Sequence, residues 1–266
     1  EHDMTDPRET PDPALCTGAE PMQVIRPRVD LCRAPAGKRD RQLLFGDAVT
    51  GLHHDGAWRL VRAAKDDFHG YLPATALGPP ETPTHHVTAR ATHAYARADL
   101  KSPDRASLSF GSRITARAET ATFIETDIGF VPRQHLHRIG DSASDPVAVA
   151  SLFMGTPYLW RGNSAAGIDC SGLVQAACLA CGLPCPGDSD QQEAALGATL
   201  PPDTAYQRND LLFWKGHVAL VIDTDRMLHA NAGHMAVAEE DIAAGIARIA
   251  DQGDGPVTAH KRLMQS

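Results

Sequence analysis

Residues 169–175, which read DCSGLVQ, decide the fold of the C-terminal part of this chain. They open a segment whose apolar residues recur with the period of a helix and fall on one side of it. Gly182 and Pro184 follow, and a glycine just past the last turn with a proline soon after is a common way for a helix to end. The stretch therefore predicts a helix that begins at Cys170 and has Asp169 as its N-terminal cap.

The predicted position of Cys170 suits a nucleophile. The first turn of a helix has free backbone N–H groups and the positive end of the helix dipole, and both favour a thiolate over a thiol. The same N–H groups can bind the oxyanion that forms when a thiolate attacks a carbonyl. A cysteine beside a capping aspartate can also be a small buried residue with no catalytic role. The catalytic interpretation therefore requires a base near the cysteine.

Two histidines on predicted neighbouring strands supply such a base. Residues 210–214 and 217–222 are apolar and are joined by a short turn, and a third apolar run at 227–230 follows a second turn. A reversal between the last two strands places His229 opposite His217 or its neighbour. Two histidines on adjacent strands can form a base and the group that orients it, which an activated cysteine requires.

A zinc site is the main alternative for the cysteines. Cys178, Cys181 and Cys185 have roughly the spacing of metal ligands, but the first two lie on the predicted buried stripe of the helix. No second pair of cysteines or histidines completes a tetrahedral set. We therefore expect no metal and no cofactor. The remaining histidines of this part, His234 and His260, have no comparable placement and are expected at the surface.

The N-terminal half contains an internal repeat. Residues 70–77 (GYLPATAL) are echoed by 129–136 (GFVPRQHL), and 45–49 (FGDAV) by 110–114 (FGSRI). Each copy has short segments of alternating apolar residues separated by turn residues, a pattern typical of a small antiparallel β-barrel. The repeat therefore predicts two small barrels that precede the helix-containing part.

These patterns divide the chain into a tail and three domains. The predicted limits are residues 1–20 for the tail, 21–80 and 84–140 for the two barrels, and 146–266 for a third domain that mixes helices and strands. Within the third domain, residues 238–250 predict an amphipathic helix packed on a sheet. The predicted fold class is α+β.

Composition and charge narrow the possible partners. The 266 residues include 25 Lys and Arg and 33 Asp and Glu, a formal net charge of −8, which argues against nucleic-acid and anionic-membrane partners. No apolar run approaches the roughly 20 residues that cross a bilayer. The first 15 residues lack the apolar segment of a secretory signal, and the six cysteines are spaced too unevenly for a disulfide framework. We expect a cytoplasmic monomer; an exported chain already stripped of its signal is the alternative.

Several linked motifs of the third domain resemble those of the NlpC/P60 cysteine peptidases in order and spacing. They are residues 158–164 (YLWRGNS), 167–175 (GIDCSGLVQ), 188–192 (DSDQQ), 210–213 (DLLF), 216–219 (GHVA) and 229–230 (HA). The resemblance implies a papain-like catalytic domain with Cys170 as nucleophile, His217 as base and His229 as the third, polarising member. It also implies that Tyr158 lies near the oxyanion and that four residues shape the substrate pocket, namely Asp169, Ser171, Asp188 and Ser189.

The predicted barrels resemble bacterial SH3 domains. The order of two SH3 domains and an NlpC/P60 domain is similar to that of the γ-D-glutamyl-L-diamino-acid endopeptidases that recycle murein peptides. The resemblance implies a substrate such as L-Ala-γ-D-Glu-meso-diaminopimelate, whose free amine is held by the first SH3 domain together with Asp188. This chain has Phe68 where that group often has tyrosine, so the phenol hydroxyl is missing. The alternatives are an exported hydrolase that acts on intact peptidoglycan and a wall-peptide binding module without activity.

Overall fold

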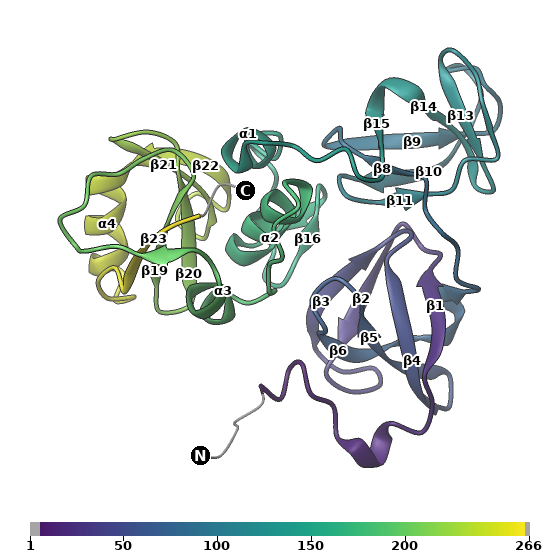
Figure 1. Ribbon diagram of the computed structural model, residues 1–266, viewed down its shortest axis with the longest axis horizontal. Coiled ribbons are helices and arrows are strands. Elements are labelled where there is room, and N and C mark those ends of the chain that lie inside the picture. The colour runs from purple at the N-terminus through teal and green to yellow at the C-terminus, as the bar shows by residue number, and fades with distance from the viewer. Residues whose placement is uncertain (1–5, 264–266) are drawn as a thin grey trace. The chain divides into compact units, whose positions relative to one another are not determined.

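The computed structural model describes residues 6–263, which divide into an N-terminal unit up to Asp141 and a C-terminal unit from Ser142 (Figure 1). Residues 1–5 of the predicted tail and 264–266 of the predicted third domain lie outside the described residues.

The first half of the N-terminal unit is a seven-stranded antiparallel sheet with the strand order β3-β2-β6-β5-β4-β1-β7. We call it the first β-subdomain, Glu20–Gly78. Leu31, Val61 and Leu72 are fully buried in its core. The strands are β1 (Glu20–Val24), β2 (Arg28–Cys32), β3 (Arg39–Leu44), β4 (Ala48–Asp55), β5 (Trp58–Ala63), β6 (His69–Pro73) and β7 (Leu77–Gly78), preceded by a 3₁₀ turn, η1 (Pro13–Leu15).

The second half of this unit, the second β-subdomain (His85–Arg138), has one sheet of five strands and one of three. Their orders are β10-β9-β14-β13-β12 and β11-β8-β15, and Leu108, Ile124 and Val131 are fully buried between them. The strands are β8 (His85–Val87), β9 (Ala91–Tyr95), β10 (Asp104–Ser109), β11 (Arg113–Ile114), β12 (Ala118–Glu119), β13 (Phe123–Thr126), β14 (Gly129–Pro132) and β15 (Leu136–Arg138).

The sequence repeat corresponds to a repeated structural pattern. In the first copy β6 runs into the 3₁₀ turn η2 (Ala74–Ala76) and then β7, and in the second β14 runs into η3 (Arg133–His135) and then β15. The glycines of the shared Phe-Gly pair, Gly46 and Gly111, both adopt the left-handed conformation, with φ of 80° and 85°. The two halves thus share backbone features that the repeat encodes, while the assignment of an SH3 domain to residues 84–140 stays a prediction.

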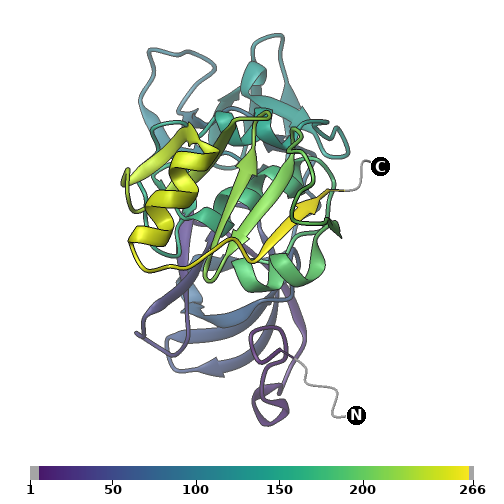
Figure 2. The same ribbon diagram turned by 90° about the vertical axis from the view of Figure 1, so that its left-hand side faces the viewer.

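The C-terminal unit is built on a six-stranded sheet with the order β18-β23-β19-β20-β21-β22. Figures 1 and 2 show helix α4 on one face of this sheet and helices α1 and α2 on the other. The helices are α1 (Pro146–Ser151), α2 (Cys170–Ala180), α3 (Ser189–Ala195) and α4 (Ile242–Asp251). The strands are β16 (Asn163–Ser164), β17 (Gly167–Ile168), β18 (Ala198–Thr199), β19 (Asp210–Trp214), β20 (His217–Val221), β21 (Arg226–Asn231), β22 (Ala236–Asp241) and β23 (Ala259–Arg262).

Helix α2 begins and ends where the sequence predicts. Asp169 is its N-cap and accepts a hydrogen bond from the backbone N–H of Gly172 at 2.8 Å. At the other end Gly182 has a φ of 74°, and the N–H of Leu183 donates to the carbonyl of Cys178 at 2.9 Å. Local sequence signals at both ends therefore determine the limits of this helix.

Two further expectations for this unit have different outcomes. The turn between β19 and β20 is confirmed as a two-residue hairpin, in which Trp214 pairs with His217. The helix predicted for residues 238–250 is wrong in its first turn, because residues 236–241 form strand β22 and α4 begins only at Ile242. Pairing with β21 along six residues outweighs the helical tendency of the alanines there.

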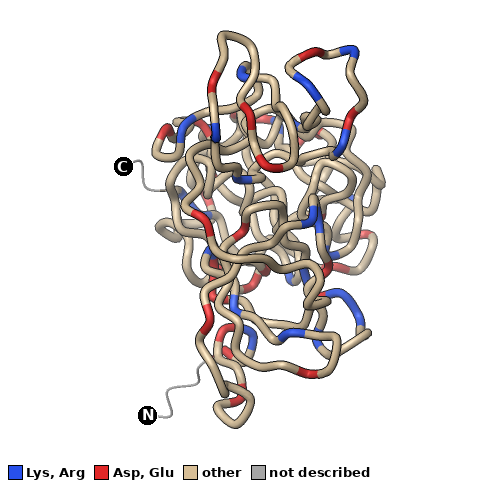
Figure 3. Tube along the Cα trace, turned by 90° about the vertical axis from the view of Figure 1, so that its right-hand side faces the viewer, with Lys and Arg blue, Asp and Glu red and all other residues tan. Residues whose placement is uncertain are grey.

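Charges of both signs are mixed along the described trace, and acidic and basic residues alternate in the loops that Figure 3 displays. Within residues 6–263, every helix is too short or too polar to pass through a lipid bilayer.

Candidate active site

Cys170 lies at the first position of α2, where the cap residue Asp169 has both carboxylate oxygens in use. Oδ1 accepts from the Gly172 N–H and, at 3.3 Å, from the Ser171 hydroxyl, while Oδ2 accepts from the Arg161 N–H at 2.9 Å. The hydrogen bonds hold the turn before α2 and the first turn of the helix together. Asp169, a predicted substrate residue, is therefore also the group that fixes the position of the sulfur.

The thiol of Cys170 is almost completely buried, with 5% of the residue exposed. Burial, together with the nearby Asp169 carboxylate, raises the pKa of this thiol to about 12, although the N–H groups of Val218, Ser171 and Cys170 act in the opposite direction. The resting Cys170 is therefore a thiol at pH 7, because burial outweighs the preference of the helix N-terminus for a thiolate. A thiol in this state needs a base that removes its proton as it reacts.

His217, at the start of β20, is next to the residue whose N–H faces the sulfur. Its Nε2 lies 2.7 Å from Nδ1 of His229 on β21. Burial lowers the pKa of His217 to about 3 and also lowers the pKa of His229, so both rings are neutral at pH 7. Neutral imidazoles are the form in which a histidine can accept a proton.

The two histidines meet where β20 and β21 part. The ladder between these strands consists of Val221 with Met227 and Leu220 with Leu228, and the histidines lie beyond its last pair. The two histidines are therefore not paired in the ladder, and the predicted register, with His229 opposite His217 or its neighbour, is wrong. They contact each other through their side chains, beyond the end of the ladder.

Sequence reasoning did not find Glu240, which contacts the far side of His229. Oε1 of Glu240 lies 2.6 Å from Nε2 of His229 and 2.5 Å from Nη2 of Arg248. Burial raises the pKa of Glu240, but the hydrogen bonds from His229 and Arg248 outweigh it and lower that pKa to about 2. A carboxylate and an arginine thus extend the histidine pair. Glu240 lies on β22 and Arg248 on α4, and their separation from His229 in the sequence matches no recognisable local motif.

Tyr158 lies close enough to Cys170 for the two groups to affect each other's ionisation. Burial raises the pKa of the Tyr158 phenol further above its ordinary value, and Cys170 and Asp169 add to the effect. The strand-like segment at Tyr158 forms a bridge with Ile168, just before the helix cap. The Tyr158 phenol and the Cys170 thiol therefore belong to the same electrostatic environment, and the role of Tyr158 near the oxyanion stays a prediction.

Asp188 and Ser189 lie at the start of α3. Asp188 is the N-cap and exchanges hydrogen bonds with Gln191 in a capping box, and Ser189 is buried. The buried Gln192 donates from Nε2 to the carbonyl oxygens of Ser171 and of Pro186, each at 2.9 Å. Gln192 therefore connects α3 to the first turn of α2 by a hydrogen bond. This role was not predicted from the sequence.

Comparison with known proteins identifies the domain that holds this site. The sequence profile of the NlpC/P60 family matches residues 155–247, which include the cysteine, both histidines and Glu240. The chain carries an NlpC/P60 domain. A second profile, the bacterial dipeptidyl-peptidase SH3 domain, matches residues 31–77 in the first β-subdomain.

Two curated relatives match the chain over part of their length. Dipeptidyl-peptidase 6 of Lysinibacillus sphaericus is 35% identical over 115 residues, 40% of this chain and 42% of that protein. Gamma-D-glutamyl-L-lysine dipeptidyl-peptidase of Bacillus subtilis strain 168 is 38% identical over 97 residues, 34% of this chain and 32% of that protein. The matched stretches thus span less than half of either relative.

Two solved structures share the fold over 92% of this chain. An NlpC/P60 family protein from Bacillus cereus ATCC 10987 has a TM-score of 0.75 at 19% identity and is covered to 99%. An NlpC/P60 endopeptidase from Photobacterium damselae subsp. piscicida has a TM-score of 0.60 at 13% identity and is covered to 70%. The predicted α+β fold class is confirmed by these likenesses.

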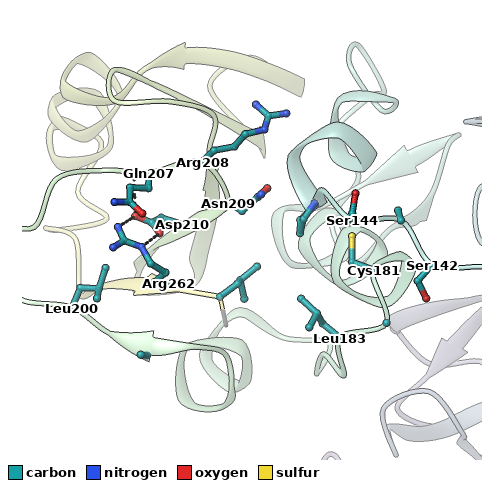
Figure 4. A pocket seen from close by; sticks show the side chains of 15 residues that line it. Ser142, Ser144, Cys181, Leu183, Leu200, Gln207, Arg208, Asn209, Asp210 and Arg262 are labelled. Atoms are coloured by element: carbon teal, nitrogen blue, oxygen red, sulfur yellow. Dashed lines mark hydrogen bonds and ion pairs between the residues drawn. The ribbon is translucent and has the colours of Figure 1, made fainter. Parts of the chain in front are cut away.

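A hollow of about 1070 Å³ in the NlpC/P60 domain lies at the end of α2 opposite to Cys170 (Figure 4). It is lined by residues that include Cys181, Asp210 and Arg262, and the last two form an ion pair at 2.7 Å. None of the predicted site residues lines it. The hollow is therefore separate from the candidate active site.

Asp210 also contacts His260, whose predicted place at the surface is wrong. His260 is 6% exposed, and its Nε2 lies 2.7 Å from Oδ2 of Asp210. The contact joins β19 and β23, which are 50 residues apart in the sequence, so it has no local signature. The other histidine left at the surface, His234, is exposed as expected.

Phe68, the departure noted in the sequence, belongs to the core of the first β-subdomain. It is 3% exposed, and the guanidinium of Arg41 lies 4.7 Å from the centre of its ring. A hollow of about 980 Å³ beside it is lined by Tyr71 and by the carboxylates of Asp6, Asp12 and Asp40, among others. Among the described residues, no cluster of three or more metal-ligating side chains is present.

Proposed function

We propose that this protein is a cysteine peptidase that hydrolyses the γ-D-glutamyl–diamino acid bond of murein peptides with a free N-terminal L-Ala. The observation that carries the proposal is the buried Cys170 at a helix N-terminus, which faces the N–H of Val218, next to a His217 that contacts His229 at 2.7 Å. The NlpC/P60 profile and a relative named gamma-D-glutamyl-L-lysine dipeptidyl-peptidase support it.

The acylation step follows from the protonation states of the resting site. The thiol proton passes to His217 while the sulfur attacks the carbonyl carbon of the γ-D-glutamyl amide. In this proposal, backbone N–H groups at the start of α2 and the phenol of Tyr158 bind the oxyanion. His217 then returns its proton to the leaving amine, and the glutamyl group remains on Cys170 as a thioester.

Deacylation uses the same base. His217 takes a proton from a water molecule, the hydroxide attacks the thioester, and the L-Ala-γ-D-Glu dipeptide leaves as the thiol recovers its proton. General acid–base catalysis of this kind contributes about 10²- to 10⁴-fold to the rate. The thiolate formed on attack is the nucleophile, so the proposed cycle includes no metal or cofactor.

Substrate selection is proposed to depend on Asp188 for the free amine. Its carboxylate at the cap of α3 attracts a cation, and Ser171 and Ser189 lie in the adjoining first turns of α2 and α3. Because Phe68 lacks a hydroxyl and is part of a core, it contributes no hydrogen bond to the amine. We propose meso-diaminopimelate as the diamino acid and released cytoplasmic peptides as the substrates.

A panel of peptides with product analysis by mass spectrometry tests the proposal. The panel contains L-Ala-γ-D-Glu-meso-diaminopimelate, its L-lysine counterpart, its N-acetylated form and its α-linked isomer, together with intact sacculi. We expect release of L-Ala-γ-D-Glu from the first peptide and much slower cleavage of the acetylated and α-linked forms. No release from either γ-linked peptide would contradict the proposed activity, and equal cleavage of the acetylated peptide would contradict the role of Asp188. Rapid release from sacculi would contradict the preference for free peptides.

A further inference from the structure

We propose that Glu240, held in place by Arg248, fixes which nitrogen of each active-site histidine carries the proton and so acts as a positioning residue for Cys170. The inference rests on the proposed function, because it explains how His217 is kept ready as the base for the thiol. It adds two residues from outside the Cys–His–His group, one on β22 and one on α4.

The contacts form one continuous chain from the sheet to α4. His217 Nε2 lies 2.7 Å from His229 Nδ1, and His229 Nε2 lies 2.6 Å from Glu240 Oε1. Arg248 then contacts both carboxylate oxygens, Oε1 from Nη2 at 2.5 Å and Oε2 from Nε at 3.3 Å. The His229 side chain is fully buried and that of Glu240 is 13% exposed, so solvent does not compete strongly for these contacts.

Proton positions along this chain follow from the ionised carboxylate. A carboxylate only accepts hydrogen bonds, so the hydrogen at the Glu240 contact belongs to Nε2 of His229. The other nitrogen of this neutral ring, Nδ1, is then an acceptor, and its partner, Nε2 of His217, must be the donor. Nδ1 of His217 is left with a free lone pair. Glu240 thus assigns the tautomer of both rings and leaves His217 with a nitrogen that can accept the thiol proton.

Arg248 offsets the effect of the Glu240 charge on the two histidines, so Glu240 acts on them mainly by accepting a hydrogen bond from a fixed direction. The guanidinium offsets the negative charge of the carboxylate, and the two groups act in opposite directions on the pKa of each histidine. Within residues 6–263, His234 also acts on His229 and lowers its pKa. An ion pair of nearly zero net charge therefore provides an oriented acceptor without making His217 permanently cationic.

Helix α4 is packed against this ion pair at Gly245. A Cβ at Gly245 would lie 3.0 Å from Cδ of Glu240 and 2.2 Å from Cε of the flexible Met227 side chain, so the backbone of α4 lies close to the carboxylate. The close approach covers the carboxylate from the side opposite to the sheet. Glu240 therefore has little freedom to turn away from His229.

The test compares Glu240→Gln with Glu239→Gln. Glu239 is the adjacent residue of β22, is exposed and pairs with Arg226, so its variant removes one carboxylate from the same strand without touching the histidines. In Glu240→Gln the amide can turn either its oxygen or its N–H toward His229. If the N–H faces His229, Nε2 of that ring must accept, and the hydrogens of both histidines move to the opposite nitrogens. We expect kcat to fall about 10- to 100-fold with little change in KM, as is typical for the loss of an outer hydrogen-bond partner. Glu239→Gln should match the unchanged protein.

Three readouts separate a tautomer effect from a general structural one. In the unaltered protein, ¹⁵N NMR of the imidazoles should place hydrogens on Nε2 of both His217 and His229; a hydrogen on Nδ1 of His229 would overturn the proposal even if Glu240→Gln fails to fold. In Glu240→Gln we expect a mixture of tautomers and a lower rate of Cys170 alkylation by iodoacetamide. Unchanged spectra and an unchanged alkylation rate in that variant would also overturn it.

The variant Arg248→Met separates the orienting hydrogen bond of Glu240 from the effect of its negative charge. It shifts the local charge opposite to Glu240→Gln but leaves the carboxylate as the acceptor, so the tautomers should stay as in the unaltered protein. If both variants instead retain the tautomers and only displace the pH profile in opposite directions, Glu240 acts through its charge and the proposal is wrong. Because alkylation and NMR need no peptide, a failure to cleave any murein peptide would reject the proposed function and leave this test intact.

Discussion

The six-stranded sheet holds two buried groups of the same composition, each made of a histidine, a carboxylate and an arginine. In both, the carboxylate bridges the other two residues at 2.5–2.7 Å. The groups are His229–Glu240–Arg248 on β21, β22 and α4, and His260–Asp210–Arg262 on β19 and β23.

The difference lies at the second nitrogen of each histidine. Nδ1 of His229 contacts His217, the neighbour of Val218, whose N–H faces the Cys170 sulfur. Nδ1 of His260 is buried and has no hydrogen-bond partner among residues 6–263. The first group is therefore connected to the proposed base, and the second ends within the sheet. A buried histidine–carboxylate–arginine group by itself stabilises the fold. It can contribute to catalysis only if Nδ1 of its histidine contacts a residue of the active site.

Removing the nucleophile should have the largest effect. Cys170→Ala should lower peptide turnover by at least about 10⁴-fold, because loss of a covalent nucleophile removes the main route of the reaction. The thermal unfolding midpoint should change little, since the alanine keeps the helix start. Cys181→Ala, at the other end of α2, is the control and should retain full turnover. Substantial activity in Cys170→Ala would contradict the assignment of the nucleophile.

Equivalent changes in the two histidines should have different consequences. His229→Ala should lower kcat about 10²- to 10⁴-fold, since it leaves His217 without the acceptor that orients it. His260→Ala should leave kcat unchanged and reduce the free energy of unfolding by about 1–3 kcal/mol, because the Asp210 carboxylate loses a buried hydrogen bond. Steady-state kinetics and urea unfolding measure the two effects. Equal losses of kcat in both variants would show that the distinction is wrong.

Neutralising Asp210 should affect stability and not turnover. Burial raises the pKa of Asp210, but the hydrogen bonds from Arg262 and His260 outweigh it and hold the pKa below its usual value. Asp210→Asn should lower the free energy of unfolding by about 3 kcal/mol at pH 7, because it breaks a buried ion pair on one side. This contribution is present above the ordinary aspartate pKa and is lost as the pH falls through the lowered one. The difference between the two proteins should therefore shrink below about pH 4.

Stability should also depend on pH through the buried His217. His217 has a pKa of about 3 in the folded protein and an ordinary value of 6.5. It therefore stabilises the fold above pH 6.5, and this contribution is lost as the pH falls, because the unfolded chain binds a proton that the folded one does not. Between pH 6.5 and 5 the slope from this residue approaches about 1.4 kcal/mol per pH unit. Urea unfolding of the unaltered protein and of His217→Gln should show a shallower slope in the variant; identical slopes would contradict a neutral buried His217.

The residues of local motifs were placed well by sequence reasoning. The start of α2 at Cys170 and its end near Gly182 depend on a cap and a left-handed glycine, which act within one turn of the helix. The contact between His217 and His229 was also expected, because a short hairpin brings the two strands together. Its register was not, because the strands part just before the histidines and no turn residue signals that opening.

The residues that sequence reasoning missed are joined by distant pairings. His260 is predicted at the surface because nothing near it indicates that β23 pairs with β19. Glu240 lies in a segment partly assigned to a helix, and only pairing with β21 turns that segment into a strand that carries the carboxylate to His229. Burial of Cys170, which raises the pKa of the thiol, likewise depends on packing against β20 and could not be derived from a helix N-terminus alone.

Local sequence is enough to specify the helix that presents the cysteine, the hairpin strand that presents the first histidine and the family of this domain. These features depend on neighbouring residues, and short-range hydrogen bonds and turn conformations fix them before the chain is packed. Packing raises the pKa of the thiol, brings His229 against Glu240 and separates the two buried carboxylates in their surroundings. Those properties depend on desolvation and on contacts between distant strands, which exist only once the sheet is assembled.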